Sequence, residues 1–353
     1  MQRRDLLRAG TVGIAGLAGC IGIFETRSAM SPPPVVENRP DAVYFPTHIE
    51  GMEMAGMGGS GRYKAGVMYS YPHRFWTITG TNTNKVTIQN DDDVHLMVSL
   101  WDSETKTVLP TANVSATIEK DGKEVDSRSL WPMLSQNMGY HFGDNMSLDG
   151  DGTYTAKLDI GQMQARRMGT LQSAFSERTS IDVEIEYSAS TKNDIMFKQL
   201  NDKQGTKGAV KPMEMQMMPV SQVPKPNDLP GTNLGEGTSG DATFVAVTTN
   251  QTPHFVSNSK SYLAVSPRTP YNRYPLPFMG LSGKLIRDGK TVFNGDLQPV
   301  LDTEIGYHYG AGVEGVESGD DLVISVEAPP QVARHEGYET AFIQMSNIQI
   351  SVR

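Results

Sequence analysis

Cysteine is almost absent from this sequence, and its scarcity excludes several kinds of site. The chain has 353 residues and a single cysteine, Cys20. Without a second thiol it can form neither an internal disulfide framework nor a site built from several cysteine ligands. A blue-copper centre in the mature domains is excluded as well, because that centre needs a cysteine thiolate and Cys20 lies in the N-terminal segment described below.

Aromatic residues and positive charge are also scarce. Only 8% of the residues are aromatic, whereas there are 35 glycines and 21 prolines, which favours many short strands and turns over long helices. The 31 Lys and Arg residues are outnumbered by 40 Asp and Glu residues, giving a net charge of −9. With no basic stripe to neutralise phosphates, we expect no nucleic-acid partner.

The motifs of common enzymes are missing too. The sequence has no Gly-x-Ser-x-Gly elbow and no glycine-rich phosphate loop that opens a helix. The acidic run Asp91-Asp92-Asp93 lacks the spacing of a calcium loop. We therefore do not expect an enzyme.

The first twenty residues have the features of an export signal. Arg3 and Arg4 precede a short apolar run, which ends in the small-residue box Leu17-Ala18-Gly19-Cys20. This pattern predicts a twin-arginine lipoprotein signal over residues 1–20, with Cys20 as the lipidated residue; a plain secretory signal or an uncleaved short anchor is the alternative. We expect a lipoprotein of archaeal type, exported and anchored to the outer face of the cell membrane.

The most informative feature is an internal duplication. Leu130–Leu134 followed by Gly139-Tyr140-His141-Phe142-Gly143 recurs as Leu297–Leu301 followed by Gly306-Tyr307-His308-Tyr309-Gly310. His141 and His308 are 167 positions apart, and this offset holds without a gap over some fifty residues. The chain therefore contains two copies of one unit.

Both copies have the pattern of antiparallel strands. In 94–100, Val94, Leu96, Val98 and Leu100 share one face, with polar residues and Met97 on the other. The pairs Asp121-Gly122 and Asp288-Gly289 predict hairpin turns at matching places. Short alternating strands at this spacing predict an all-β chain with two tandem antiparallel β-sandwich domains.

Composition divides the chain into five segments. After the signal come a Pro-rich tether (21–44), a first domain (45–187), a linker (188–240) that contains methionines, and a second domain (241–353). One methionine run lies at 52–57, near the start of the first domain, and a second at 213–218, in the linker. Such runs resemble copper-binding thioether tracts; packing is the alternative, and we favour packing.

Histidine and methionine residues of the first copy form a candidate metal site. His95 and Met97 share one face of their strand, and Met133 and His141 belong to the repeated stretch. Imidazole nitrogen with thioether sulfur is a ligand combination for copper or iron. The alternative is that Met133 packs and His141 hydrogen-bonds to the backbone. For His73 and His254 we expect ordinary surface or core roles.

The stretch from Trp131-Pro132-Met133 through Gly139–Asn145 to Gly152-Thr153-Tyr154 resembles the periplasmic iron-transport protein family. The resemblance implies immunoglobulin-like β-sandwich domains that bind iron or copper beside an iron permease. It also implies a ligand set of an early His, a Met, a turn His and a late His. By position, the first three correspond to His95, Met133 and His141, with Met97 as a possible fourth ligand.

Neither copy has the complete ligand set. The late His falls near Arg167 in the first copy, while the second copy has His308 and His335 but Tyr262 and Val300 in place of His95 and Met133. Either the first domain binds metal with fewer ligands and the second is degenerate, or the two share ligands across an interface. We favour the first alternative.

These observations predict an extracytoplasmic lipoprotein that binds iron or copper in iron uptake or copper handling, with an iron permease as a possible partner. The alternative is a cell-surface structural or interaction protein whose domains have lost metal binding.

Overall fold

The computed structural model describes residues 32–256 and 261–353. The predicted signal and Cys20 lie outside the described residues, as does the tether up to residue 31. Within the described part, no helix is long and apolar enough to cross a membrane.

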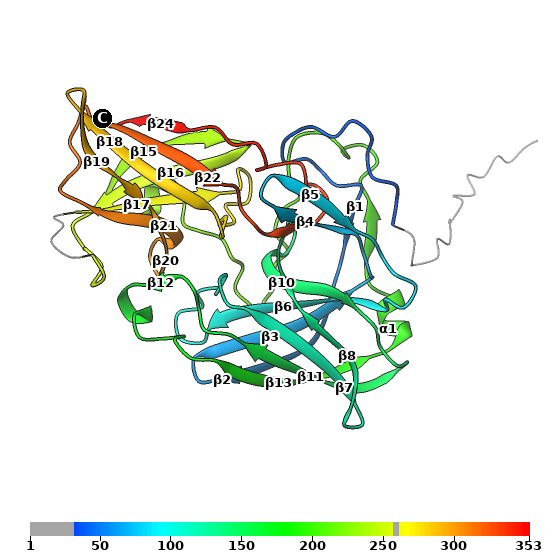
Figure 1. The fold of residues 1–353 in the computed structure, drawn as a ribbon. Helices are drawn as coiled ribbons and strands as arrows, with labels where there is room; N and C mark the ends of the chain where they lie inside the picture. The colour runs from blue at the N-terminus through cyan, green and yellow to red at the C-terminus, as the bar shows by residue number, and fades with distance from the viewer. Residues whose placement is uncertain (1–31, 257–260) are drawn as a thin grey trace, which may run out of the picture.

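The first sandwich packs an eight-stranded sheet against a four-stranded sheet (Figure 1). The larger sheet has the order β2 (Glu53–Ser60), β3 (Tyr63–Ser70), β6 (Val94–Asp102), β10 (Gly139–Met146), β9 (Trp131–Ser135), β23 (Ala333–Arg334), β4 (Phe75–Thr79), β5 (Asn82–Val86). The smaller has the order β13 (Thr179–Tyr187), β11 (Gly152–Ile160), β7 (Val114–Lys120), β8 (Lys123–Ser129).

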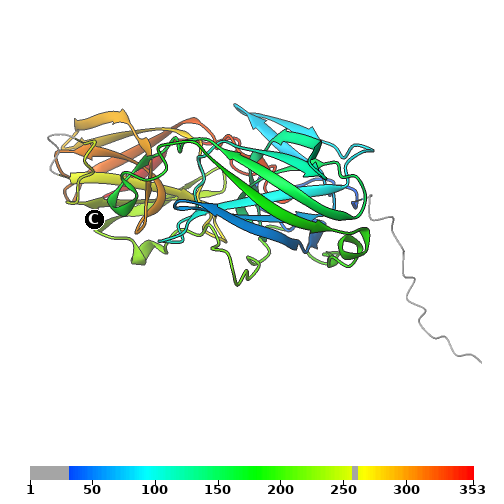
Figure 2. The ribbon, with the colours of Figure 1, turned by 90° about the horizontal axis from the view of Figure 1, so that it is seen from below.

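The second sandwich lies beside the first (Figure 2) and is built in the same way. Its larger sheet has the order β12 (Arg166–Arg167), β20 (Gln298–Asp302), β21 (Gly306–Val313), β17 (Ser261–Arg268), β16 (Ala242–Thr249), β15 (Thr232–Ser239). Its smaller sheet has the order β19 (Lys290–Asp296), β18 (Gly280–Arg287), β22 (Asp321–Ala328), β24 (Ile348–Ser351). The predicted all-β class with two tandem immunoglobulin-like sandwiches is confirmed.

The offset of 167 holds in three dimensions. The strands of the repeated stretch, β9 and β10, begin 167 positions before β20 and β21. Both predicted hairpin turns form, with positive φ at Asp121 (52°), Gly122 (72°), Asp288 (49°) and Gly289 (74°). Two consecutive residues of positive φ suit the type I′ turn that Asp-Gly favours.

The two halves exchange short strands. β12, which follows the first sandwich, pairs in parallel with β20 of the second, so that Arg166 is opposite Val300. β23, which follows β22 of the second sandwich, pairs in parallel with β9 of the first, so that Ala333 is opposite Met133. Each copy therefore adds its late segment to the repeated stretch of the other.

Two segments differ from their sequence-based description. The methionine run at 52–57, to which we assigned no strand, lies largely in β2. Alternate glycines let β2 pack closely on β13, because a Cβ on Gly56 or Gly58 would collide with Val183 or Ile181. The expected linker at 188–240 includes helix α1 (Ala189–Asn193), β14 (Phe197–Gln199), which pairs with β1 (His48–Glu50), the 3₁₀ turn Pro226–Asp228 and β15. A further 3₁₀ turn, Gly169–Leu171, precedes it.

Strand β6 is buried on both faces, although its sequence alternates. All nine of its residues are buried. Val94, Leu96, Val98 and Leu100 lie in the main core, whereas Met97 and Trp101 belong to a separate apolar cluster on the opposite face. The side that we expected to be polar is therefore covered by protein, and His95 is 0% exposed there.

Arg334 fixes the segment that leads out of β23. Its side chain is 0% exposed and donates hydrogen bonds to the carbonyls of Pro330, Tyr338, Ala341 and Phe342. Burial lowers the pKa of this guanidinium to about 9. A buried charge is retained here because it satisfies several carbonyls at once.

We expect Arg334→Met to lower the free energy of unfolding by about 3 kcal/mol or more, since each buried carbonyl left without a donor costs ~1–3 kcal/mol. The control is Arg167→Met at the same position of the first copy, because Arg167 is only partly buried and donates to two carbonyls, those of Met163 and Ala165. Urea denaturation measures both. Equal losses for the two variants would contradict this role of Arg334.

Candidate metal centre

Three paired strands bring the predicted ligands of the first copy to one face of the larger sheet. His95 on β6 is opposite Asn145 on β10, and His141 on β10 is opposite Met133 on β9. Asn145 and His141 are four residues apart in one strand, and cross-strand partners point the same way. His95, Met133 and His141 therefore share a face, and each is at most 1% exposed.

The second half of the chain supplies a further histidine to this face. The backbone N–H of His335, directly after β23, donates to the carbonyl of Leu134 on β9 at 3.0 Å. The centroid of its ring lies 5.1 Å from that of His141 and 5.3 Å from that of His95. The strand exchange thus places His335 in the site of the first copy.

A fourth imidazole comes from the loop between β3 and β4. The His73 ring lies against His95, with centroids 4.0 Å apart, and its centroid is 4.6 Å from that of His335. The ligand nitrogens of these three histidines all lie within 4.8 Å of one another. The four imidazoles of His73, His95, His141 and His335 are called the imidazole cluster below.

Hydrogen bonds fix which nitrogen is free in the rings of His95 and His141. The Nδ1–H of His95 donates to Asn145 Oδ1 (2.9 Å), while the amide of Asn145 donates to the carbonyl of His73 (3.1 Å). The Nδ1–H of His141 donates to the carbonyl of Gly139 (3.1 Å). With the proton on Nδ1, the lone pair of Nε2 is available to a metal ion, and such partners are those that orient histidine ligands.

None of these free nitrogens has a protein partner. Nε2 of all four imidazoles is buried and makes no hydrogen bond with the described residues. Buried polar atoms are normally paired, because an unpaired one costs free energy. Four such atoms side by side indicate that the cluster is built to hold something that the polypeptide does not supply.

The electrostatic surroundings keep the rings of His95, His141 and His335 neutral. Burial, reinforced by the neighbouring imidazoles, holds the pKa values of His95 and His335 well below the ordinary value of 6.5. Burial lowers the pKa of His141 to about 4. Neutral rings offer lone pairs to a cation at neutral pH without first having to lose a proton.

Gly143, the last glycine of the repeated stretch, leaves the space between two of these ligands open. A Cβ at this position would lie 3.0 Å from His95 Nε2 and 3.4 Å from Met133 Sδ. The sulfur and the free nitrogen therefore border the same small space. The four imidazole nitrogens and this thioether are the candidate donor set.

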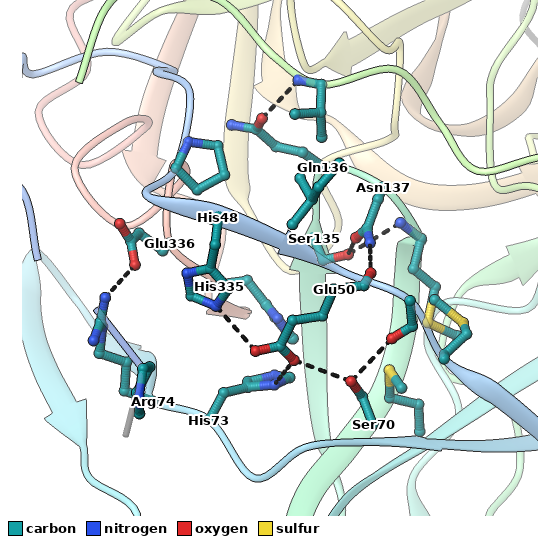
Figure 3. Close-up of a pocket in the computed structure, with 18 residues that line it drawn as sticks. His48, Glu50, Ser70, His73, Arg74, Ser135, Gln136, Asn137, His335 and Glu336 are labelled. Carbon is teal, nitrogen blue, oxygen red and sulfur yellow. Dashed lines mark hydrogen bonds and ion pairs between the residues drawn. The ribbon is translucent and has the colours of Figure 1, made fainter. Parts of the chain in front are cut away.

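A carboxylate supports the cluster from behind. Glu50, at the end of β1, accepts hydrogen bonds from His48 Nε2 (2.9 Å) and Ser70 Oγ (3.0 Å) and lies 3.3 Å from His73 Nδ1 (Figure 3). Burial alone would raise the pKa of Glu50, but the two histidine contacts outweigh it and lower the pKa to about 2. Glu50 is thus an anion that orients His73 with Nε2 facing the cluster.

Met97, which we named as a possible fourth ligand, has contacts of two kinds. It lines the same cavity as His73 and His335 but packs with Met68, Trp101 and Met138. Met97 can pack in this way because β6 is buried on both faces.

The corresponding place in the second sandwich is filled by protein. His308 is 0% exposed, its Nε2 pairs with the Tyr262 hydroxyl (3.0 Å), and its Nδ1 pairs with the Gly306 carbonyl (2.9 Å). The Tyr262 ring occupies the space that a Cβ on Gly310 would enter. Tyr262 and Val300 belong to an apolar cluster against which Met168 packs. The described part of the second copy leaves His308 without a free nitrogen.

The structure differs from two interpretations of the sequence. His335 lies with His73, His95 and His141 and not with His308, which pairs with Tyr262. This arrangement matches the alternative that we did not favour, in which the two copies contribute residues across an interface. His73 has no ordinary surface or core role, because it belongs to the cluster. His73 lies outside the duplicated stretch, so the repeat did not indicate it as a ligand. Its contact with Glu50 is formed only in the folded chain.

Comparisons with known proteins give a family but little functional detail. No curated protein matches the chain. Among solved structures, FetP of uropathogenic Escherichia coli strain F11 is 17% identical with a TM-score of 0.29, covering 39% of this chain and 96% of that one. A copper-bound variant of Campylobacter jejuni P19 is 13% identical with a TM-score of 0.29, covering 40% of this chain and 97% of that one.

These scores are too low to assign a function, so the functional argument depends on the side chains of this chain. The model of a domain of unknown function, DUF7350, matches residues 73–184 and 227–351. Those two ranges cover both sandwiches and more than half of the sequence. The chain therefore belongs to the DUF7350 family.

Proposed function

We propose that this protein binds a transition-metal ion in the imidazole cluster and carries it outside the cytoplasm. The observation that supports the proposal most strongly is the convergence of four imidazoles, each with a buried and unpartnered Nε2. Nitrogen lone pairs of neutral rings, held by hydrogen bonds at Nδ1, are the donors that first-row transition metals prefer in proteins.

The donor set favours copper, with iron as the second choice. Imidazole suits copper, iron, zinc and nickel, but a thioether such as Met133 is a soft ligand that selects copper, above all Cu(I). No thiolate is present to hold the ion irreversibly, since Cys20 is the only cysteine. An ion held by neutral ligands can be taken up and passed on, which suits a carrier.

The cellular role follows from the N-terminal sequence. A twin-arginine pair and a lipobox-like Leu-Ala-Gly-Cys segment support export and attachment of Cys20 to the outer face of the membrane. There the protein would collect copper or iron, and a metal permease in the same membrane is the partner that would receive it.

The test compares the two histidines of the repeated stretch. We expect His141→Gln to weaken Cu(II) binding by ~100-fold or more, above the ~10–100-fold that follows loss of a supporting residue. The matched control, His308→Gln, occupies the same turn of the second copy and should bind like the parent, because Tyr262 and Gly306 already occupy its nitrogens.

Isothermal titration of the full chain with Cu(II), together with thermal unfolding to check each fold, gives the readout. If His141→Gln and the parent bound Cu(II) equally well, the cluster would not be the site, and the protein would be better understood as a surface structural or interaction protein.

A further inference from the structure

The two methionine runs that the metal proposal leaves unused meet in one place. Residues from the run at 52–57 and from the run at 213–218 pack together on the outer face of the larger sheet of the first sandwich. Of the 19 methionines in the chain, seven belong to this cluster: Met52, Met54, Met68, Met97, Met138, Met215 and Met218. It is separate from the main core of the sandwiches.

Strand register aligns three of these residues. Met54 on β2 is opposite Met68 on β3, and Met68 is opposite Met97 on β6. Adjacent strands lie ~4.8 Å apart, and cross-strand partners point the same way, so the three thioethers form a row across the sheet. The row ends at Gly143 of β10, the residue beside His95 and Met133.

One end of this cluster faces a cavity instead of being packed closed. Met52, Met97 and Met138 line a cavity of about 80 Å³ that His73, His335 and Glu50 also line. In the close-up the sulfur atoms of the lining residues gather on the side of Glu50 away from Glu336 (Figure 3). Thioethers and imidazoles therefore border one shared space.

We propose that Met52, Met97 and Met138 form a second metal site, specific for Cu(I), next to the imidazole cluster. Thioether sulfur is uncharged and soft, so it holds Cu(I) in preference to Cu(II), Zn(II) or Fe(II). Pure packing explains the site less well, because Leu and Ile fill a core with better-defined rotamers, and flexible Met specifies packing poorly. A flexible thioether lining is, however, what a site that loads and releases a soft ion requires.

This site goes beyond the proposed function and does not depend on it, since the thioethers need no imidazole to bind Cu(I). The shared cavity would let an ion move between sulfur and nitrogen ligands without entering bulk water. Glu50 lines the same cavity, so a carboxylate borders the space that the ion would occupy.

The experiment is an anaerobic titration of the full chain with Cu(I), buffered by a chromophoric competing chelator. We expect the parent to bind two Cu(I) ions. The triple variant Met52→Leu/Met97→Leu/Met138→Leu keeps side-chain volume nearly constant, which limits its effect on folding. It should bind one ion, the other being weakened by ~100-fold or more because the soft ligands are gone.

Two controls separate this site from the imidazole cluster. Met68→Leu, in the same methionine cluster but not in the cavity lining, should still bind two ions. His141→Gln/His335→Gln should keep the thioether-bound Cu(I) while losing Cu(II), and X-ray absorption of that variant should show sulfur neighbours around copper.

Each outcome decides the question. If the triple variant bound Cu(I) with the stoichiometry and affinity of the parent, the thioether site would be refuted, whatever the imidazoles bind. If the histidine variant lost all Cu(I), the sulfurs would hold no ion by themselves and the proposal would fail. If the parent bound a single Cu(I) that only the triple variant lost, the thioether site would stand and the imidazole cluster would not bind Cu(I).

Discussion

We expect His335→Gln to weaken Cu(II) binding by ~100-fold or more, more than the ~10–100-fold that loss of a supporting residue causes. His335 is 194 or more residues from each of its partners His73, His95 and His141 in the sequence. Its backbone is nevertheless tied to Leu134, and its ligand nitrogen lies within 4.8 Å of those of His73 and His95. When His335 is removed, no other donor among the described residues takes its place on that side of the cluster.

The measurement is isothermal titration of parent and variant with Cu(II). His254→Gln is the control, because His254 is exposed and lies in the second half of the chain, away from the cluster. Thermal unfolding without metal must show that His335→Gln is folded. Parent-like affinity in a folded His335→Gln protein would mean that the strand exchange does not serve the site.

A second ion should bind when the second sandwich is given the ligands of the first. The offset of 167 pairs Tyr262 with His95, Val300 with Met133, and Met168 with His335, while His308 already corresponds to His141. The geometry is also matched, since the N–H of Met168 donates to the carbonyl of Leu301 at 3.0 Å as that of His335 does to Leu134.

We therefore expect Tyr262→His/Val300→Met/Met168→His to raise the Cu(II) stoichiometry from one to two. Replacing Tyr262 removes the ring that fills the space and frees Nε2 of His308. The new site should bind ~10–100-fold more weakly than the original, because Gly312 stands where Asn145 orients His95.

Titration combined with metal analysis after desalting counts the ions. Tyr262→Phe removes only the hydroxyl, leaves the space filled, and should still bind one ion. A folded triple variant that held a single ion at every Cu(II) concentration would show that this ligand set, placed on this framework, is not sufficient for binding.

Local sequence signals predicted most of the fold. Alternation in β6, β11 and β13, and Asp-Gly pairs with two positive φ values, depend on nearest neighbours and so can be read from the sequence. The short elements within the expected linker and the exchanged strands could not be predicted in this way. β12 and β23 are two residues long, and a two-residue strand has no periodicity.

The site was predictable only where its residues lie in the repeated stretch. His95, Met133 and His141 follow from strand pairing within one copy. His335 arrives through a long-range parallel contact, and His73 is fixed by Glu50 and Asn145, neither of which is near it in the sequence. For Met97, alternation predicted the face of the strand but not the neighbours, because a segment more than one hundred residues away covers that face.

The most direct test is anomalous diffraction at the copper edge from crystals of the full chain loaded with Cu(II). We predict a strong peak among the Nε2 atoms of His73, His95, His141 and His335, beside the Met133 sulfur. A well-occupied copper ion elsewhere on the protein, with no peak in the imidazole cluster, would contradict it.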